Sequence, residues 1–272
     1  MVGASAPIVR PSRSDTMLDS TMILIRFSAY GAWVDIRNHF GRTRLGTLWN
    51  ALGLTALIAA LGLFFGTILK NELAGYAAYL PFLTAGVLVW AFLSASINQS
   101  CSVFGTRAQT LRHTAQPFAA IPISTVMRNL IIFLQNTVLA VIIYGVVFGS
   151  FPVHLPAFIT GAVLVAANVL WISALAALAC IRFRDLPQLI AGTLNVAFFL
   201  TPILWQEHFL GRYAILADIN PAYHLISLVR LPLLGGAPTA LSWMVGLAML
   251  GVGSAVTVIA YAQARQKIPY WL

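Results

Sequence analysis

Long charge-free runs, separated by short segments that hold the charges, are the main pattern of this chain. The first such run extends from residue 45 to 69 and ends at Lys70 and Glu72. As an α-helix, its 25 residues would extend about 37 Å, enough to cross the ~30 Å hydrocarbon core of a bilayer with some tilt. The pattern therefore predicts a membrane span over residues 45–69.

Apolar runs in the middle of the chain predict three further spans. The charge-free run 73–106 is longer than one span needs. Residues 129–181 carry no formal charge over more than fifty positions, which is enough for two spans. The turn between these two is GSFPVHLP, in which Gly149, Pro152 and Pro156 are helix breakers.

The C-terminal third of the chain predicts two more spans and an irregular segment between them. The spans extend over residues 186–206 and 239–264. Residues 207–238 mix charge, proline and glycine with apolar patches too short to cross a bilayer. The prediction is an all-α integral membrane protein with six transmembrane helices. A count of five or seven spans follows if the interpretation of the 207–238 segment is wrong.

The N-terminal segment has a helical apolar stripe but too many charges to span a membrane. We interpret residues 1–15 as a disordered cytoplasmic tail and residues 16–41 as an amphipathic helix in the headgroup plane. Packing of this helix on soluble protein is the alternative. The stripe consists of Leu18, Met22, Ile25, Ala29, Trp33, Ile36 and Phe40.

Two polar features lie within or between the apolar runs. The stretch SASINQSCS (94–102) is expected to line protein or water rather than lipid. Arg182, Arg184 and Asp185 fall between two predicted spans. Each of these charges would cost about 2.5–3.5 kcal/mol at a helix centre, so we interpret them as a surface turn. Pro187 fits the start of the following helix.

The distribution of basic residues predicts the orientation, because cytoplasmic loops carry an excess of Lys and Arg. With the N-terminus inside, thirteen of the sixteen basic residues are cytoplasmic, and residues 265–272 form a cytoplasmic C-terminal tail. Only Lys70, Arg212 and Arg230 fall outside. The cytoplasmic set is Arg10, Arg13, Arg26, Arg37, Arg42, Arg44, Arg107, Arg112, Arg128, Arg182, Arg184, Arg265 and Lys267.

Composition excludes several classes of protein. Of the residues, 60% are hydrophobic and only 8% are charged, whereas soluble domains carry about 25% charge. The net charge of +9 does not indicate nucleic-acid binding, because the basic residues lie at the ends of apolar runs.

The motifs of enzymes and ATPases are also missing from the sequence. The serine in GVGSA (251–255) has no histidine after His224 to activate it, and the five histidines lack metal-ligand spacing. The only lysines, Lys70 and Lys267, do not lie in a phosphate-binding loop. We therefore expect no catalytic residue, metal site or cofactor in this chain. Any ATP and Mg²⁺ would be bound by a partner.

Four stretches of the sequence form a recognisable set: RTRLGTLWNALG (42–53), RFRDLPQLI (182–190), TPILW (201–205) with INPAYHLISLVR (219–230), and the closing IPYWL (268–272). In this order and spacing they resemble the membrane subunit of ABC-2-type exporters, specifically the O-antigen and polysaccharide permeases. The resemblance covers roughly residues 20–272, with the six-span transmembrane domain at 42–264.

This resemblance implies a transporter assembly in the bacterial inner membrane. It would contain two copies of this chain and two ATP-binding subunits, and would move a polyprenyl-pyrophosphate-linked glycan outward. An exporter for teichoic acid, capsule or a hydrophobic drug is the alternative within transport. A scaffold or intramembrane enzyme working without an ATPase is the alternative outside it.

The resemblance also implies roles for cytoplasmic residues. Residues 106–120 would form a loop that holds a coupling helix, which docks into the ATPase. The contacts with that subunit would be Arg107, Arg112 and His113, together with Arg182, Arg184 and Asp185 of the turn. Arg42 and Arg44 would bind the carrier's pyrophosphate, for which simple anchoring by positive charge is the alternative.

On the outer side, residues 206–237 would form short re-entrant helices that gate the exit. The gate residues would be Pro202, Asn220 and Pro221. Aromatic faces lining a sugar channel would come from Trp90, Phe92, Phe199, Trp205 and Tyr223. Lipid-facing or interfacial anchoring is the alternative for each aromatic residue.

Overall fold

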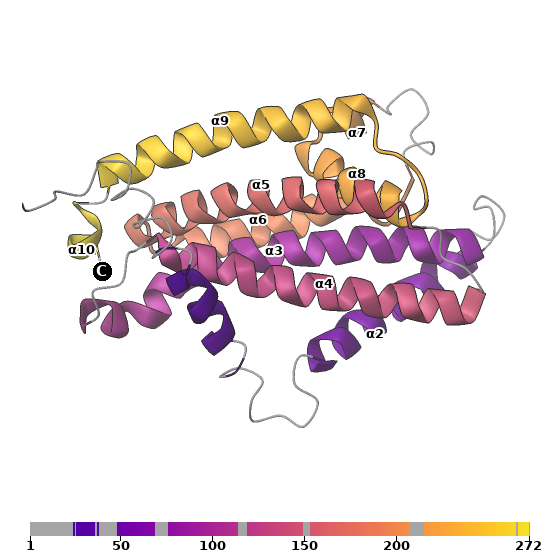
Figure 1. Cartoon of the computed structure of the whole chain (residues 1–272), viewed down its shortest axis with the longest axis horizontal. Helices are drawn as coiled ribbons and strands as arrows, with labels where there is room; N and C mark the ends of the chain where they lie inside the picture. The colour runs from indigo at the N-terminus through magenta and orange to yellow at the C-terminus, as the bar shows by residue number, and fades with distance from the viewer. Residues whose placement is uncertain are drawn as a thin grey trace, which may run out of the picture.

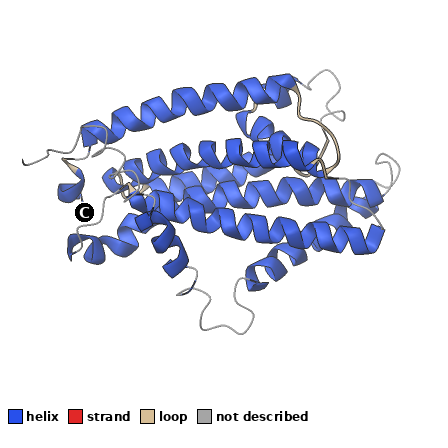
Figure 2. Ribbon diagram, viewed as in Figure 1, coloured by secondary structure: helices blue, strands red, loops and turns tan. Residues whose placement is uncertain are grey.

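The chain folds as a bundle of α-helices (Figure 1). The computed structural model describes residues 24, 26–35, 37, 48–68, 76–113, 119–148, 153–206, 215–264 and 266–271. Within these ranges all regular structure is helical, and Figure 2 colours the described residues as helices with a few loops and turns. The prediction of an all-α fold is confirmed for this part of the chain.

Four helices are long and apolar enough to cross a membrane. They are α3 (Tyr76–His113), α4 (Ala120–Phe148), α5 (Leu155–Arg182) and α9 (Ala240–Ala264), and they run side by side along the bundle in Figure 1. Their positions agree with the second, third, fourth and sixth predicted spans. The chain is therefore a multi-pass membrane protein.

Two shorter apolar helices lie where the first and fifth spans are predicted. These are α2 (Leu48–Ile68) and α6 (Leu186–Leu200). With 15 residues, α6 extends about 22 Å, less than the ~30 Å of a bilayer core. It ends because Thr201 adopts an extended conformation, which a following proline favours. The predicted run 186–206 is thus helical only to Leu200, and the six-span count stays a prediction.

Short helices occupy the segment before α9. The helices α7 (Ile215–Ile219) and α8 (Pro221–Leu233) precede it, and α10 (Ile268–Trp271) follows it. Most of α8 is buried, and it packs against α3, α5 and α9. Short helices are therefore present where they are predicted. Their re-entry from the outer side stays a prediction.

Glycines allow α5 to approach its neighbours closely. A Cβ atom at Gly161 would overlap the backbone carbonyl of Leu228 on α8. On α9, a Cβ atom at Gly253 would overlap the ring of Trp171 on α5. Small residues at such crossings are typical of membrane bundles, where packing drives association. These contacts place α5 at the centre of the fold.

The N-terminal helical residues pack on the beginning of α4. Ser28 Oγ donates to the carbonyl of Leu24 at 2.8 Å and lies 3.4 Å from the carbonyl of Ala120. Ser28 and Ala32 are buried, whereas Trp33 is 64% exposed. The face with Trp33 is thus available to a lipid surface. The predicted tail at 1–15 lies outside the described residues.

Candidate functional site

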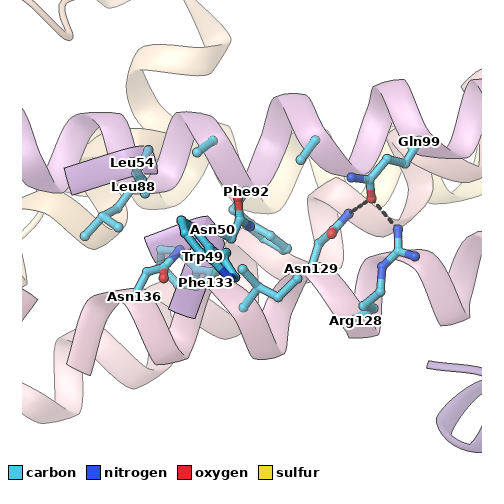
Figure 3. Close-up of a pocket in the computed structure, with 13 residues that line it drawn as sticks. Trp49, Asn50, Leu54, Leu88, Phe92, Gln99, Arg128, Asn129, Phe133 and Asn136 are labelled. Atoms are coloured by element: carbon cyan, nitrogen blue, oxygen red, sulfur yellow. Dashed lines mark hydrogen bonds between the residues drawn. The ribbon is translucent and has the colours of Figure 1, made fainter. Parts of the chain in front are cut away.

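A polar cavity opens between α2, α3 and α4, within the predicted membrane region. Its volume is about 450 Å³ (Figure 3). The cavity combines amide, guanidinium and aromatic side chains, and we call it the α2–α4 cavity. Its lining residues are Trp49, Asn50, Leu54, Leu88, Ala91, Phe92, Ala95, Gln99, Arg128, Asn129, Ile132, Phe133 and Asn136.

Gln99 connects α3 to α4 at one end of this cavity. Its Oε1 atom accepts hydrogen bonds from Arg128 Nη2 at 2.5 Å and from Asn129 Nδ2 at 2.8 Å, as Figure 3 shows. The guanidinium also forms an ion pair with the N-terminal helix, since Arg128 Nη1 lies 3.7 Å from Asp35 Oδ2. Arg128 lies about 12 Å from the start of α4 by helical rise. The hydrogen bond to Gln99 and the ion pair with Asp35 offset the free-energy cost of placing its charge in an apolar helix.

Asn136 lies deeper in the cavity, near the middle of α4. Its side chain is 8% exposed. Its Oδ1 atom has no hydrogen-bond partner among the described residues. A buried acceptor without a partner costs about 1–3 kcal/mol. The Oδ1 atom of Asn136 therefore does not stabilise the described fold, and stability does not explain why a polar residue is present here.

Aromatic side chains cover the apolar part of the cavity. Phe92 of α3 and Phe133 of α4 stack with ring centroids 5.3 Å apart. Trp49 enters from the first turn of α2 and is largely exposed (Figure 3). The arrangement thus places the exposed Trp49 ring and a buried aromatic wall beside amide groups.

A second polar cluster lies where the chain leaves α6 and enters α8. Tyr79 Oη donates to the carbonyl of Leu204 at 2.8 Å, and Asn220 Nδ2 donates to Thr201 Oγ1 at 3.1 Å. Arg230 Nη1 donates to the carbonyl of Pro202 at 2.6 Å. We call this cluster the α6–α8 junction. It fixes residues 201–204, all of them buried, against α3 and α8.

Arg230 is a buried charge in the α6–α8 junction. It is 4% exposed, and its guanidinium carbon lies 4.2 Å from the ring centroid of Phe82 on α3. A cation over an aromatic face gains about 2 kcal/mol or more when desolvated. The ring and the Pro202 carbonyl therefore make the buried charge tolerable.

The structure brings the predicted gate residues together but disperses the predicted channel aromatics. Pro202 and Asn220 both belong to the α6–α8 junction, and Pro221 begins α8 beside them. Phe92 lies in the α2–α4 cavity, whereas Trp90 is buried against Phe198.

The other predicted aromatics lie elsewhere. Trp205 Nε1 donates to the carbonyl of Phe199 on α6, and Tyr223 is on α8, edge-on to His224. The five aromatic residues therefore do not share one cavity within the described chain. Their roles in a channel and a gate stay predictions.

The turn between α5 and α6 is present as predicted. Arg182 ends α5, Arg184 and Asp185 form the turn, and all three are exposed. Pro187 lies in the first turn of α6, where a missing N–H is harmless. The guanidinium of Arg182 lies 5.1 Å from the ring centroid of Trp271 on α10. The turn and the C-terminal helix therefore lie at the same end of the bundle.

Other predicted contacts are described only in part. Arg107, Arg112 and His113 belong to the last turns of α3, so residues 106–113 continue that helix rather than forming a loop. Their side chains lie outside what the structure describes, as do Arg42 and Arg44 altogether. Among the described residues, no three of His, Cys, Asp and Glu lie together as metal ligands would.

The sequence interpretation missed most of the α2–α4 cavity. Gln99 falls in the stretch 94–102, which was expected to line protein or water, and this is confirmed for Gln99, Ser96 and Ser100. Asn129 and Asn136 were not identified. Their spacing of seven residues, two helical turns, places them on one face of α4 and was the available signal.

Comparisons with known proteins agree on one class of protein. A family described as "ABC-2 type transporter" matches residues 31–234. The O-antigen export system permease protein RfbA of Myxococcus xanthus is 24% identical over 172 residues, covering 63% of this chain and 65% of that protein. A protein of the same name from Klebsiella pneumoniae is 23% identical over 198 residues, covering 71% and 74%. The chain thus matches just under two thirds of the length of the Myxococcus relative.

Proposed function

Because the chain belongs to the ABC-2 type transporter family, we propose that it is the transmembrane subunit of an ATP-driven O-antigen-type exporter. The cargo is a lipid-linked polysaccharide, moved from the cytoplasmic to the outer side of the bacterial inner membrane. The observation that carries the proposal is the family match over residues 31–234, which includes α2 through α8. The names of the Myxococcus and Klebsiella relatives support the cargo class.

ATP binding belongs to a partner subunit in this proposal. Phosphate loops use a lysine after a glycine, and both lysines of this chain, Lys70 and Lys267, lie in other contexts. The working unit has two copies of this chain and two ATPase subunits, with ATP and Mg²⁺ held by the latter. The helices α2 and α6 complete six spans, and both termini are cytoplasmic.

The end of the bundle that carries the α5–α6 turn is the side that meets the ATPase. Arg184 and Asp185 are exposed there, and Arg182 is held against Trp271. The long α3 ends in a basic segment with Arg107 and Arg112. Rigid helices transmit a movement of the partner into the bundle. At the opposite end, the α6–α8 junction with α7 and α8 forms the re-entrant exit gate.

Isolation of the native complex tests this proposal. The tagged chain is extracted in gentle detergent, purified, and its partners are identified by mass spectrometry. We expect a stoichiometric soluble chain that carries a Gly-Lys-Ser/Thr phosphate loop. Deletion of the gene for this chain should remove a surface polysaccharide while its precursor accumulates inside. Purification of the chain alone, under conditions that keep a known exporter intact, would overturn the proposal.

A further inference from the structure

We propose that the α2–α4 cavity binds a neutral sugar unit of the exported polysaccharide. This inference rests on the function proposed above and assigns its cargo a binding site within one subunit. Several features of the cavity support it: its charge, its hydrogen-bonding groups, its aromatic faces and its volume.

The charge of the cavity favours an uncharged polar ligand. Arg128 is the only charged residue among those that line it. Its guanidinium lies 3.7 Å from Asp35, so the described groups at this end sum to a neutral pair. A phosphate-binding site would instead present basic groups that carboxylates do not neutralise. The cavity is therefore suited to hydroxyl groups rather than to an anion.

The hydrogen-bonding groups match the chemistry of hydroxyls. Asn50, Gln99, Asn129 and Asn136 line the cavity, and each amide both donates and accepts. A sugar hydroxyl also does both. Asn136 Oδ1 lacks a partner among the described residues and lies near the centre of a spanning helix. This oxygen is buried, so a ligand hydroxyl that reached it would supply the hydrogen bond that the described chain does not.

The aromatic side chains and the volume fit a sugar ring. Trp49 is 57% exposed and supplies a flat apolar surface that suits the C–H face of a pyranose, while the buried, stacked Phe92 and Phe133 form part of the apolar wall. The volume of about 450 Å³ falls in the ~300–1,000 Å³ range of small-ligand sites. Such sites combine apolar walls with a few placed polar groups, as this cavity does.

A pair of matched substitutions separates ligand binding from structural support. Asn136→Leu removes a polar atom that has no described partner, so thermal stability should stay the same or rise while export falls about fivefold, the size of one net hydrogen bond. Asn168→Leu is the control, because that amide bonds to Leu164, Gly246 and Trp171. It should lower stability. Wild-type export with Asn136→Leu would contradict the inference.

Photo-crosslinking in cells identifies the ligand directly. A benzoylphenylalanine at Ile132, which lines the cavity, should crosslink to the cell's own polysaccharide, detected by periodate staining of the purified chain. Val146, 81% exposed on the same helix, is the control position and should not give this product. Crosslinks at Ile132 to phospholipid alone, or equal glycan labelling at both positions, would overturn the inference.

Failure of this inference is distinguishable from failure of the proposed function. If the ATPase co-purifies and polysaccharide reaches the surface, the exporter assignment stands whatever the crosslinks show. Unlabelled Ile132 in such cells would then reject the sugar site alone. If no ATPase co-purifies and the surface polysaccharide is independent of this chain, the exporter assignment itself fails.

Discussion

At the scale of single residues, Asn136 and Asn168 show how partners decide what a buried amide does. Asn168 Nδ2 donates to Leu164 and to Gly246 of α9, and its Oδ1 accepts from Trp171. All of its contacts hold α5 to its own turn and to α9. Asn136 has the same chemistry on α4 and lines the α2–α4 cavity, but its Oδ1 is buried without a partner among the described residues. We therefore assign the first amide to packing and the second to a ligand.

Gly161 makes the sharpest prediction about a single residue. A methyl group there overlaps the Leu228 carbonyl of the buried α8, so Gly161→Ala should lower the free energy of unfolding by about 1–3 kcal/mol. Gly251→Ala on α9 meets nothing within 4 Å and is the control. Thermal unfolding in detergent, followed by fluorescence-detected size exclusion, measures both. Equal melting temperatures for Gly161→Ala and wild type would contradict the close approach.

Asn220 predicts a second effect of a single side chain. Its Oδ1 accepts from the Ala222 N–H as the N-cap of α8, while its Nδ2 donates to Thr201. Asn220→Ala should cost about 1–2 kcal/mol, because the cap and the bond to the α6–α8 junction are both lost. Asn220→Asp keeps the cap and should cost less. The order of thermal stabilities, wild type above Asp above Ala, tests this assignment.

At the scale of elements, the charged residues along the sequence indicate where the membrane-spanning runs end, but not where the helices begin and end. The charge-free run beginning at residue 129 led to a predicted span there, but α4 begins at Ala120. Likewise, α3 continues past residue 106 to His113. Residues such as Ala108, Gln109 and Leu111 favour helix whether or not lipid surrounds them. Hydropathy alone therefore could not give these helix boundaries.

The packing of elements also explains why the sequence did not predict most of the α2–α4 cavity. The polar residues that line it are single amides in apolar runs, on three consecutive helices. Which of them meet depends on the rotation of each helix, and tertiary packing sets that rotation. By contrast, the α5–α6 turn depended only on local charges and Pro187, and its prediction succeeded.

The docking of the N-terminal helix on α4 is a prediction about elements. Asp35→Asn should weaken this docking by about 1 kcal/mol, between the values typical of exposed and buried ion pairs. The measurement is the rate at which a maleimide labels Ala32→Cys, which is buried in the docked state. Labelling should be severalfold faster in the Asp35→Asn background. The Asp35→Arg, Arg128→Asp double variant should restore slow labelling.

At the scale of the whole molecule, the two ends of the bundle differ in kind. One end carries the exposed α5–α6 turn and α10, held together by Arg182 over Trp271. At the other end, His154 precedes α5 and donates its backbone N–H to the carbonyl of Pro232 on α8. The first end presents exposed charges, and the second is closed by packed short helices.

This difference predicts where the ATPase docks. Arg184→Glu combined with Asp185→Lys should reduce co-purification of the ATPase at least severalfold, with insertion and yield unchanged. His154→Ala, at the opposite end of α5, is the matched control and should leave co-purification intact. Quantitative mass spectrometry of the purified complexes measures both. Normal recovery of the ATPase with the double variant would remove the turn from the interface.

Arg128 has a consequence that goes beyond its role in lining a cavity. One guanidinium holds Gln99 inside the cavity and Asp35 on the N-terminal helix. If cargo binds in the cavity as proposed, its binding and the docking of the N-terminal helix are thermodynamically linked through this residue. This linkage is reciprocal. If bound cargo changes the free energy of helix docking by some amount, docking of the helix changes the free energy of cargo binding by the same amount. The docking of the N-terminal helix would then depend on whether the cavity is occupied.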